Sequence, residues 1–245
     1  MNGVWGRLLQ AHLATFSEDI PFWKSLARRT GGPILELGCG AGRLLPTFAA
    51  EGTVIGVDHE PTMVYRAASA RGADPNGNAI ALVRADLLAL PLRASFKLIV
   101  MACNLMGQLS DDDAALCLTG VFSRLAPGGW FAAELPSTVD QAMPVSARTT
   151  PIATFVEPES QHPIQVFARQ TRQEEDVVVW WNYDELFPDG RVVRHGRRER
   201  FTLRSPERMT SLLREVGFTE VEFFGDYLRG PWTDRSLAYL VTASR

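Results

Sequence analysis

The residues best able to bind a ligand lie together at 36–42, Glu-Leu-Gly-Cys-Gly-Ala-Gly, where three glycines alternate with other residues after an acid. An apolar run at 33–35 precedes them and a helical pattern follows, which predicts a strand, a tight turn and the start of a helix. Glycine adopts the positive φ that such a turn requires and lets a ligand approach the backbone closely. The first turn of a helix adds unpaired N–H groups and a partial positive charge. The loop is therefore predicted to bind a small ligand with a polar or anionic end.

Two acids end the next predicted strands. Asp58 closes the second strand, sixteen residues after Gly42, and Asp86 closes the third. The two oxygens of a carboxylate are both acceptors, so Asp58 can bind both hydroxyls of a ribose. Its alternative role is a cap for the helix beginning at Glu60, and one carboxylate can do both. Dinucleotide-binding enzymes also place an acid here, so Asp58 alone does not separate the classes of nucleotide-binding protein.

The elements that must position these residues alternate between strands and helices. Residues 8–29 are predicted to be helical, with a second helix starting at Pro21. Strands are predicted at 34–36, 53–57, 80–84, 96–102 and 130–134, helices at 42–50, 60–71 and 111–125, and turns at 76–78 and 127–129. Apolar strands separated by helices indicate a parallel sheet covered on both faces. The fold class predicted is α/β, doubly wound, with a mostly parallel, Rossmann-like sheet of seven strands.

The pattern changes after Pro136. A long loop is predicted over 137–163, followed by antiparallel strands at 165–172, 176–186 and 191–204, the last two joined by the turn sequence Pro-Asp-Gly. A helix at 205–216 and strands at 219–225 and 237–243 complete the sheet. We expect one domain over 1–245, with a helical cap at 1–30, a ligand-binding core at 31–136, an antiparallel insertion at 137–204 and a closing segment at 205–245.

Composition excludes several classes of protein. The net charge is −3 over 245 residues and the isoelectric point is about 5.9, so no overall basic field favours nucleic acid. No apolar run approaches the ~20 residues of a transmembrane helix, and the N-terminus does not have the pattern of a secretory signal. We therefore expect a cytoplasmic protein with no membrane or nucleic-acid partner. The three cysteines form no CxxC pair or Cys/His cluster, so neither a metal site nor a disulfide framework is predicted.

The spacing of the glycines is G-x-G-x-G, whereas nicotinamide and flavin folds prefer G-x-G-x-x-G. With Glu36 in front, the loop resembles the first motif of class I S-adenosylmethionine (AdoMet) dependent methyltransferases. The resemblance implies AdoMet as cofactor and S-adenosylhomocysteine as product. It places Asp58 on the ribose and Asp86 on the adenine amine, although Asp86 can also be a solvated strand end. The cofactor-binding residues it implies are Glu36, Gly38, Cys39, Gly40, Gly42, Asp58, His59, Met63, Asp86, Leu87, Cys103 and Asn104.

Residues 101–109, at the end of the fourth predicted strand, indicate which kind of acceptor the protein methylates. The motifs of DNA amino-methyltransferases and cytosine-C5 enzymes are absent there, because Asn104 is followed by leucine and Cys103 follows alanine. Residues 18–22, 217–218 and 225–227 are similar to a bacterial branch that methylates small molecules. The resemblance covers about 16–136 well, and in this family an insertion such as 137–204 forms a lid or acceptor wall. The expected partner is a small-molecule acceptor, and the sequence leaves open whether the chain forms a homodimer.

Methyl transfer needs an acceptor lone pair held in line with the breaking bond, so positioning carries most of the catalysis and a base is optional. The candidate catalytic residues are Asn104, His162, Tyr183 and His195, and Glu134 is a further acceptor-site candidate. Each also has a structural explanation. Asn104 can cap a turn, His162 can lie in a loop and Tyr183 can pack in the core. His195 can lie on the surface of a hairpin, and Glu134 can end a strand in solvent. The arginines at 191–204 can likewise be a solvated face or a site for an anionic acceptor. The predicted function is N- or O-methylation of a small molecule. The alternatives are a catalytically silent AdoMet-binding protein and, less favoured, an NAD-dependent oxidoreductase.

Overall fold

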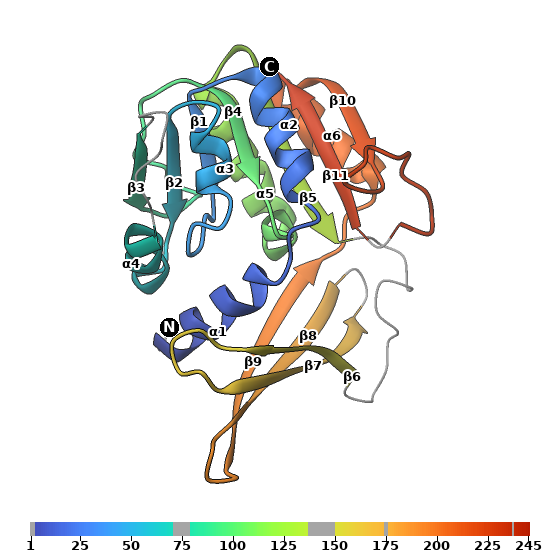
Figure 1. Cartoon of the computed structure of the whole chain (residues 1–245). Coiled ribbons are helices and arrows are strands. Elements are labelled where there is room, and N and C mark those ends of the chain that lie inside the picture. Colours follow the sequence, from blue (N-terminus) through green and yellow to red (C-terminus); the bar gives the residue numbers. More distant parts are fainter. Residues whose placement is uncertain (1–2, 71–78, 137–149, 174–175, 237) are drawn as a thin grey trace.

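The computed structural model describes residues 3–70, 79–136, 150–173, 176–236 and 238–245 (Figure 1). Its main sheet has seven strands in the order β10-β11-β5-β4-β1-β2-β3. The strands are β1 (Ile34–Leu37), β2 (Val54–Asp58), β3 (Ile80–Arg84), β4 (Phe96–Met101), β5 (Leu125–Pro136), β10 (Thr219–Phe224) and β11 (Ala238–Ser244). β1 to β5 run parallel, whereas β11 is antiparallel to both β5 and β10. The predicted α/β fold with a mostly parallel seven-stranded sheet is confirmed.

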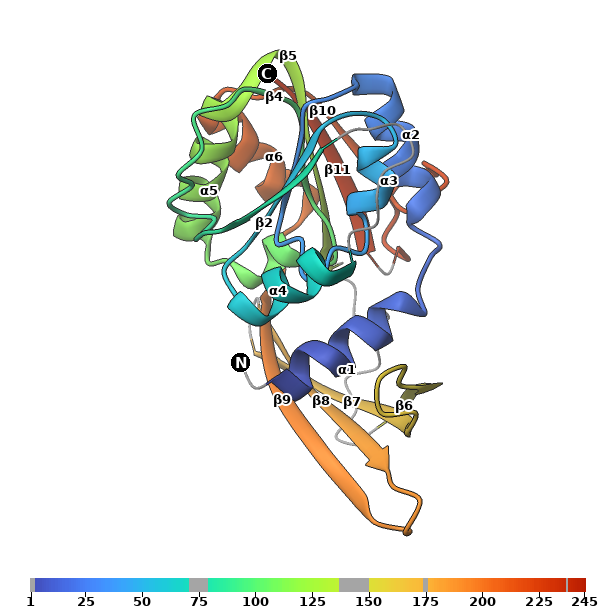
Figure 2. The same ribbon diagram turned by 60° about the vertical axis from the view of Figure 1, so that its left-hand side comes forward.

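Helices cover both faces of this sheet, as Figure 2 shows. The helices of the described residues are α1 (Gly3–Ala14), α2 (Ile20–Thr30), α3 (Leu45–Ala49), α4 (Pro61–Ala70), α5 (Asp111–Arg124), α6 (Pro206–Val216) and the short 3-10 helix η1 (Leu105–Gln108). α5 and α6 pack on one face, and α2 and α3 pack on the other. β4 explains this layering, because its apolar residues are buried on both sides of the sheet. Ile99 and Met101 face α5, whereas Leu98 and Val100 face α2 and α3.

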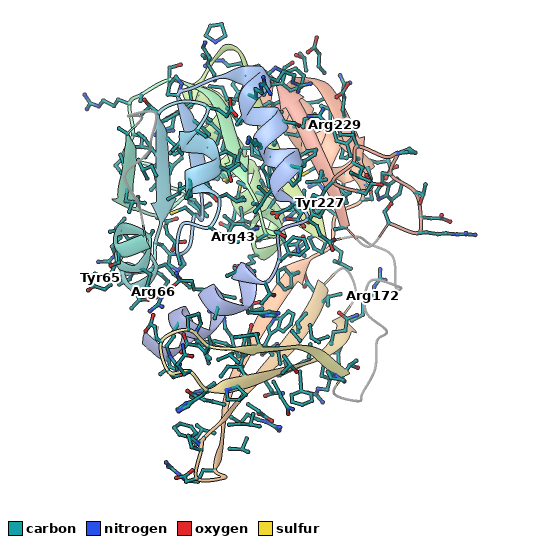
Figure 3. All side chains as sticks on the ribbon, viewed as in Figure 1. Arg43, Tyr65, Arg66, Arg172, Tyr227 and Arg229 are labelled. Atoms are coloured by element: carbon teal, nitrogen blue, oxygen red, sulfur yellow. The ribbon has the colours of Figure 1, made fainter. Side chains whose placement is uncertain are left out.

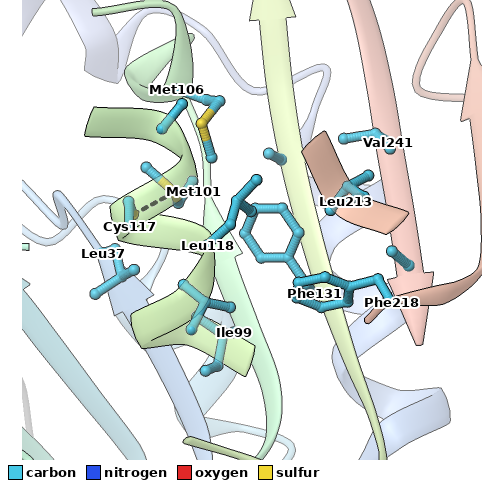
Figure 4. Packing of buried hydrophobic residues seen from close by; sticks show 14 of the residues in the cluster. Leu37, Ile99, Met101, Met106, Cys117, Leu118, Phe131, Leu213, Phe218 and Val241 are labelled. Atoms are coloured by element: carbon cyan, nitrogen blue, oxygen red, sulfur yellow. Dashed lines mark hydrogen bonds between the residues drawn. The ribbon is translucent and has the colours of Figure 1, made fainter. Parts of the chain in front are cut away.

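The larger core lies between the sheet and the pair α5 and α6 (Figure 4). Phe131 of β5 lies at its centre, fully buried, with the ring of Phe218 at 5.8 Å. Leu118 of α5 and Leu213 of α6 close the core from the helix side. Burying one such side chain contributes roughly 1.5–3 kcal/mol. The core therefore holds the strand ends, and the residues that follow them, in fixed positions.

A second sheet has four antiparallel strands in the order β6-β7-β8-β9. They are β6 (Thr150–Val156), β7 (Pro163–Gln173), β8 (Asp176–Leu186) and β9 (Val192–Thr202). Figures 1 and 2 show α1 between this small sheet and the carboxyl ends of the parallel strands of the main sheet. Leu8 of α1 is buried with Ile164, Val166 and Tyr183, and the ring of Trp5 stands edge-on to Tyr183 at 5.0 Å.

Three local predictions differ from the structure. The helix after the glycine loop has only five residues and begins at Leu45 instead of 42, because the positive φ of Gly42 and the bend behind it delay its start. β6 lies inside the predicted loop 137–163, since Ala153 and Phe155 pack toward α1 and its backbone pairs with β7. The predicted turn at 127–129 belongs to β5, where Arg245 bonds the backbone of Gly128 and Gly129. The predicted turn at 76–78 lies outside the described residues.

Candidate active site

Polar side chains line the carboxyl edge of the main sheet, one from each neighbouring strand. Following the order β2-β1-β4-β5, these are Asp58 at the end of β2, Glu36 in β1, Cys103 after β4 and Glu134 in β5. Asp86 follows β3 at the same edge, because the N–H of Ala85 bonds the carbonyl of Asp58 at 3.1 Å. The two acids predicted to contact one nucleoside therefore lie on adjacent strand ends.

The glycine loop uses positive φ at all three glycines, +66° at Gly38, +54° at Gly40 and +86° at Gly42. Their surroundings differ. A Cβ on Gly38 would overlap the side chain of Leu105, whereas a Cβ on Gly40 would meet no atom within 4 Å. The loop thus packs tightly against η1 on one side and leaves open space at Gly40, where a ligand can approach the backbone.

Asp58 both supports this loop and caps the next helix. Its carboxylate accepts from the N–H of Gly40 and from the N–H of Glu60, each at 2.9 Å. The side chain is largely buried, with 9% of the residue exposed. A carboxylate has about four lone-pair positions, so two remain for a ligand. The helix-capping role is present in the structure and leaves room for the ribose role.

The remaining residues predicted near the adenosine lie around α4. Asp86 is exposed, and one of its oxygens accepts from the N–H of Leu88 at 2.9 Å. Met63 is buried on α4, where its sulfur lies near Gly6 of α1. His59 is exposed beside Asp58, and Leu87 is partly buried. Contact with adenine stays a prediction for all four.

An ion pair that we did not predict joins the glycine loop to the start of α2. Arg43 donates to both oxygens of Asp19, at 2.8 and 2.6 Å, and to the carbonyl of Phe16 at 3.1 Å. Asp19 is fully buried and also accepts from the indole N–H of Trp23 at 3.0 Å. Such a bidentate pair has fixed geometry. It ties the connection between α1 and α2 to the loop.

Two further acids are buried at this edge. Only 4% of Glu36 is exposed, and its Oε2 has no hydrogen-bond partner among the described residues. Burial raises the pKa of Glu36 to about 8, with Arg43 opposing the shift and Asp19 adding to it. Glu134 accepts from the hydroxyl of Tyr227 at 2.5 Å and from the N–H of Cys103 at 3.0 Å. Burial also raises the pKa of Glu134, although these two hydrogen bonds oppose the shift.

The residues after β4 are held in an uncommon backbone conformation. Cys103 and Asn104 both have positive φ, +55° and +58°. Non-glycine residues seldom adopt this region, and those that do cluster at functional sites. The Oδ1 of Asn104 is buried with no partner in the described part of the chain, so Asn104 has an acceptor to offer a ligand.

The other candidate catalytic residues lie in the small sheet. The hydroxyl of Tyr183 bonds the ring of His12 at 2.7 Å, which joins β8 to α1. His162 and His195 both bond the carboxylate of Glu185, at 2.9 and 3.0 Å. Arg7 of α1 bonds the same carboxylate at 3.0 Å. These contacts attach α1 to the small sheet, and among the four candidates only Asn104 stands next to the glycine loop.

This attachment is electrostatic as well as apolar. Burial alone would raise the pKa of Glu185, but hydrogen bonds from His162, Arg7 and His195 lower it to about 2. Arg7 also bonds Glu157, which is almost fully buried. Glu185 is therefore charged at neutral pH, and its hydrogen bonds with Arg7, His162 and His195 hold α1 against the small sheet.

The arginines of 191–204 are largely matched by neighbouring groups. Arg194 bonds Asp184 and Arg200 bonds Asp176 on the adjacent strand. Arg198 lies over the ring of Trp180, 5.8 Å from its centre. These contacts favour a solvated strand face over a site for an anionic acceptor.

Sequence reasoning missed Asp19, Arg43 and Tyr227 as members of the site. Figure 3 shows Arg43 and Tyr227 at the end of the main sheet that faces α1. The position of Arg43 directly after the glycine loop was the one feature of the sequence that could have placed it in the site. Tyr227 belongs to the segment 225–227 that resembles the bacterial branch, but no local pattern links it to Glu134, more than ninety residues away in sequence.

The residues present fit AdoMet. Space at Gly40 admits a ligand to the backbone, Asp58 has lone pairs free, and Glu36 has a buried oxygen without a partner. In the described residues no group of three His, Cys, Asp or Glu side chains is arranged to hold a metal ion. The described helices are all too short or too polar to cross a membrane. The order of the seven-stranded sheet, the three-glycine loop and the acid ending β2 agree with the resemblance to class I AdoMet-dependent methyltransferases.

Comparison with known proteins agrees with this class. Residues 34–129 match the family model described as a methyltransferase domain. The segment that holds the glycine loop and the strands β1 to β4 is therefore similar to methyltransferase domains. No curated protein matches the sequence significantly.

Solved structures extend the likeness to nearly the whole chain. An AdoMet-dependent methyltransferase from Clostridium acetobutylicum ATCC 824 has a TM-score of 0.79 at 14% identity, covering 98% of this chain and 96% of that one. The CcbJ methyltransferase from Streptomyces caelestis has a TM-score of 0.74 at 21% identity, with coverages of 93% and 89%. CalS10, an amino pentose methyltransferase from Micromonospora echinaspora, has a TM-score of 0.70 at 18% identity, with the same coverages. At these identities the likeness establishes the fold.

Proposed function

We propose that this protein transfers a methyl group from AdoMet to a nitrogen or oxygen atom of a small molecule. The observation that carries the proposal is the row of polar groups along the carboxyl edge of the sheet, where Glu36 Oε2 and Asn104 Oδ1 have no hydrogen-bond partner among the described residues. Asp58 binds the ribose, Asp86 the adenine, and the glycine loop with Glu36 the methionine part. AdoMet supplies an electrophilic methyl group on a positively charged sulfur.

The acceptor reaches the methyl group over β4 and β5. Asn104 and Glu134 stand on that side of the glycine loop, and α1 and the small sheet lie opposite the carboxyl ends of the parallel strands (Figure 1). These elements orient the acceptor lone pair and exclude water, which supplies most of the rate enhancement of such a transfer. A small-molecule acceptor agrees with structural neighbours such as the amino pentose methyltransferase.

Isothermal titration and methyl transfer test this proposal together. We expect purified protein to bind AdoMet and S-adenosylhomocysteine at micromolar concentration and to show no heat with NAD(H). Labelled AdoMet incubated with a pool of small metabolites should yield a labelled product. Binding without any product would favour the catalytically silent protein, and binding of NAD(H) alone would favour the oxidoreductase.

A further inference from the structure

The charges at the carboxyl edge of the main sheet are not balanced by one another. Arg43 bonds both oxygens of Asp19, so its charge is matched there. Glu36 and Glu134 are buried, and no ion pair to either is found among the described residues. A buried carboxylate is costly unless it is protonated or paired with a cation. Each of these two acids therefore marks a place that favours a positively charged group of a ligand.

Glu36 and Glu134 lie at different distances from Asp58, the acid predicted to bind the ribose. Glu36 is in β1, the neighbour of the strand that ends in Asp58, whereas Glu134 is in β5, three strands away from β2. Neighbouring strands are about 4.8 Å apart, which separates Asp58 from Glu134 by roughly 14 Å along the edge. Under the proposed function the cofactor takes the Glu36 end of this row. Glu134 is then left for a positive group that the cofactor does not provide.

The carboxylate of Glu134 is oriented by hydrogen bonds from two other parts of the chain. One oxygen accepts from the backbone of Cys103 after β4, and the other from Tyr227. The ring of Tyr227 packs edge-on against Phe16 at 5.8 Å and Phe22 at 6.5 Å, which fixes its hydroxyl. Two hydrogen bonds leave about two lone-pair positions of the carboxylate for a ligand. A rigid, buried acceptor of this kind selects a cationic donor.

We propose that Glu134 binds the amino group of the acceptor, that Tyr227 positions its carboxylate, and that the substrate class is therefore a basic amine. This rests on the proposed function. The protonated amine gives one N–H proton to Glu134, which frees the nitrogen lone pair. That pair forms the new N–C bond as the methyl–sulfur bond breaks and its electrons remain on sulfur. The products are a methylated ammonium ion and a neutral thioether, and Glu134 returns its proton to water.

A pair of cofactor analogues tests this without knowledge of the acceptor. Sinefungin carries an amino group in place of the methyl group of AdoMet, on a carbon that replaces the sulfur, whereas S-adenosylhomocysteine has a neutral sulfur and no group in the methyl position. The two share the adenosine and the amino acid tail, so the ratio of their dissociation constants isolates the interaction of the extra ammonium group. In the wild-type protein we expect sinefungin to bind about tenfold more tightly than S-adenosylhomocysteine. Equal affinities would overturn the proposal.

The variant Glu134→Gln should abolish this preference and leave the affinity for S-adenosylhomocysteine within about twofold. Glu36→Gln is the matched control, because it weakens both ligands alike and keeps their ratio. Tyr227→Phe should lower the ratio severalfold, and it serves as the second variant if Glu134→Gln does not fold. A ratio unchanged in Glu134→Gln or in Tyr227→Phe, or a parallel loss of both ligands in Glu134→Gln, contradicts the proposal. If the wild-type protein binds neither ligand, the proposed function itself fails.

Discussion

Glu36 couples protonation to both folding and ligand binding. Its pKa is about 8 in the folded protein, compared with the ordinary value of 4.5 for a glutamate. Between these two values the folded state keeps a proton that the unfolded state has lost. Stability therefore falls as pH rises from about 4.5 to 8, by at most about 1.4 kcal/mol per pH unit, and levels off above that range. A cationic ligand at Glu36 favours the charged form, so its binding near pH 7 expels the proton.

We predict that binding of AdoMet at pH 7 releases up to one proton through Glu36. Titration calorimetry in two buffers with different ionisation enthalpies measures this release. Glu36→Gln should remove most of it and should flatten the pH dependence of urea unfolding between pH 5 and 8. Equal proton release in the variant would assign the proton to another group.

Replacing Asp58 by alanine should weaken AdoMet binding by ~1–3 kcal/mol, because the hydrogen bonds between its carboxylate and the ribose hydroxyls are lost. Because Asp58 also holds the N–H groups of Gly40 and Glu60, the melting temperature must be measured beside the affinity. Asp58→Asn is the control, since it keeps one acceptor oxygen. Full affinity in the alanine variant would remove Asp58 from the ribose site.

At the residue scale, the sequence was informative where a role depends on local spacing. The positions of the glycine loop, Asp58 and Asp86 were predictable because turns and strand ends are local patterns, and their contacts with the cofactor stay predictions. The bonds from Arg43 to Asp19 and from Tyr227 to Glu134 were not, because each joins residues far apart in sequence. Burial of a charged residue depends on the whole fold, and hydropathy along the chain does not report it.

At the scale of elements, the glycine loop is held between β1 and η1. Gly38 packs against Leu105 of η1, whereas Gly40 faces open space. The two glycines therefore have different reasons to lack a side chain: close packing at Gly38, and room for the ligand at Gly40. Replacing either glycine also places a side chain on a residue with positive φ, which destabilises the protein by about 1–2 kcal/mol.

This contrast gives a paired prediction. Gly40→Ala should lower the free energy of unfolding by only about 1–2 kcal/mol, the cost of its φ, and should reduce AdoMet affinity at least tenfold. Gly38→Ala should destabilise the protein further, because Leu105 and η1 must move. Urea unfolding with and without AdoMet separates the two effects. Undiminished AdoMet binding by Gly40→Ala would show that the ligand does not approach the backbone there.

Elements were predictable in the main sheet and less so in the insertion. Strands such as β4 are buried on both faces and appear as continuous apolar runs. β6 is an edge strand whose residues alternate in exposure, and Pro151 and Pro158 near its ends resemble a loop. α3 is too short for a helical period to fix its start.

At the scale of the whole molecule, one buried side chain joins the two sheets. Arg204, directly after β9, is 1% exposed and bonds Asp111 of α5 at 2.8 Å. It also donates to the carbonyls of Met106 at 2.9 Å and Leu109 at 2.7 Å, beside η1. The small sheet is thus fixed to the segment that follows β4, next to the site.

We predict that Arg204→Met lowers the free energy of unfolding by ~2–4 kcal/mol, because the carbonyls of Met106 and Leu109 lose their donor, whereas the partly exposed Asp111 keeps its bond to Arg208. Arg200→Met is the matched control on the same segment, since the pair of Arg200 with Asp176 is exposed and is worth at most about 1 kcal/mol. Urea unfolding measures both. Equal costs would mean that Arg204 does not join the sheets.

The four strands of the small sheet come from one uninterrupted stretch of chain between β5 and α6. A donor insert can therefore be exchanged at two junctions without altering the glycine loop or the acids that follow β2 and β3. Such a chimera also needs the donor's own N-terminal helix, because α1 is matched to this sheet through Trp5, Arg7 and His12. Under the proposed function, the acceptor is selected by two segments, residues 3–14 and 150–202, that are separate in sequence from the segment that binds the cofactor.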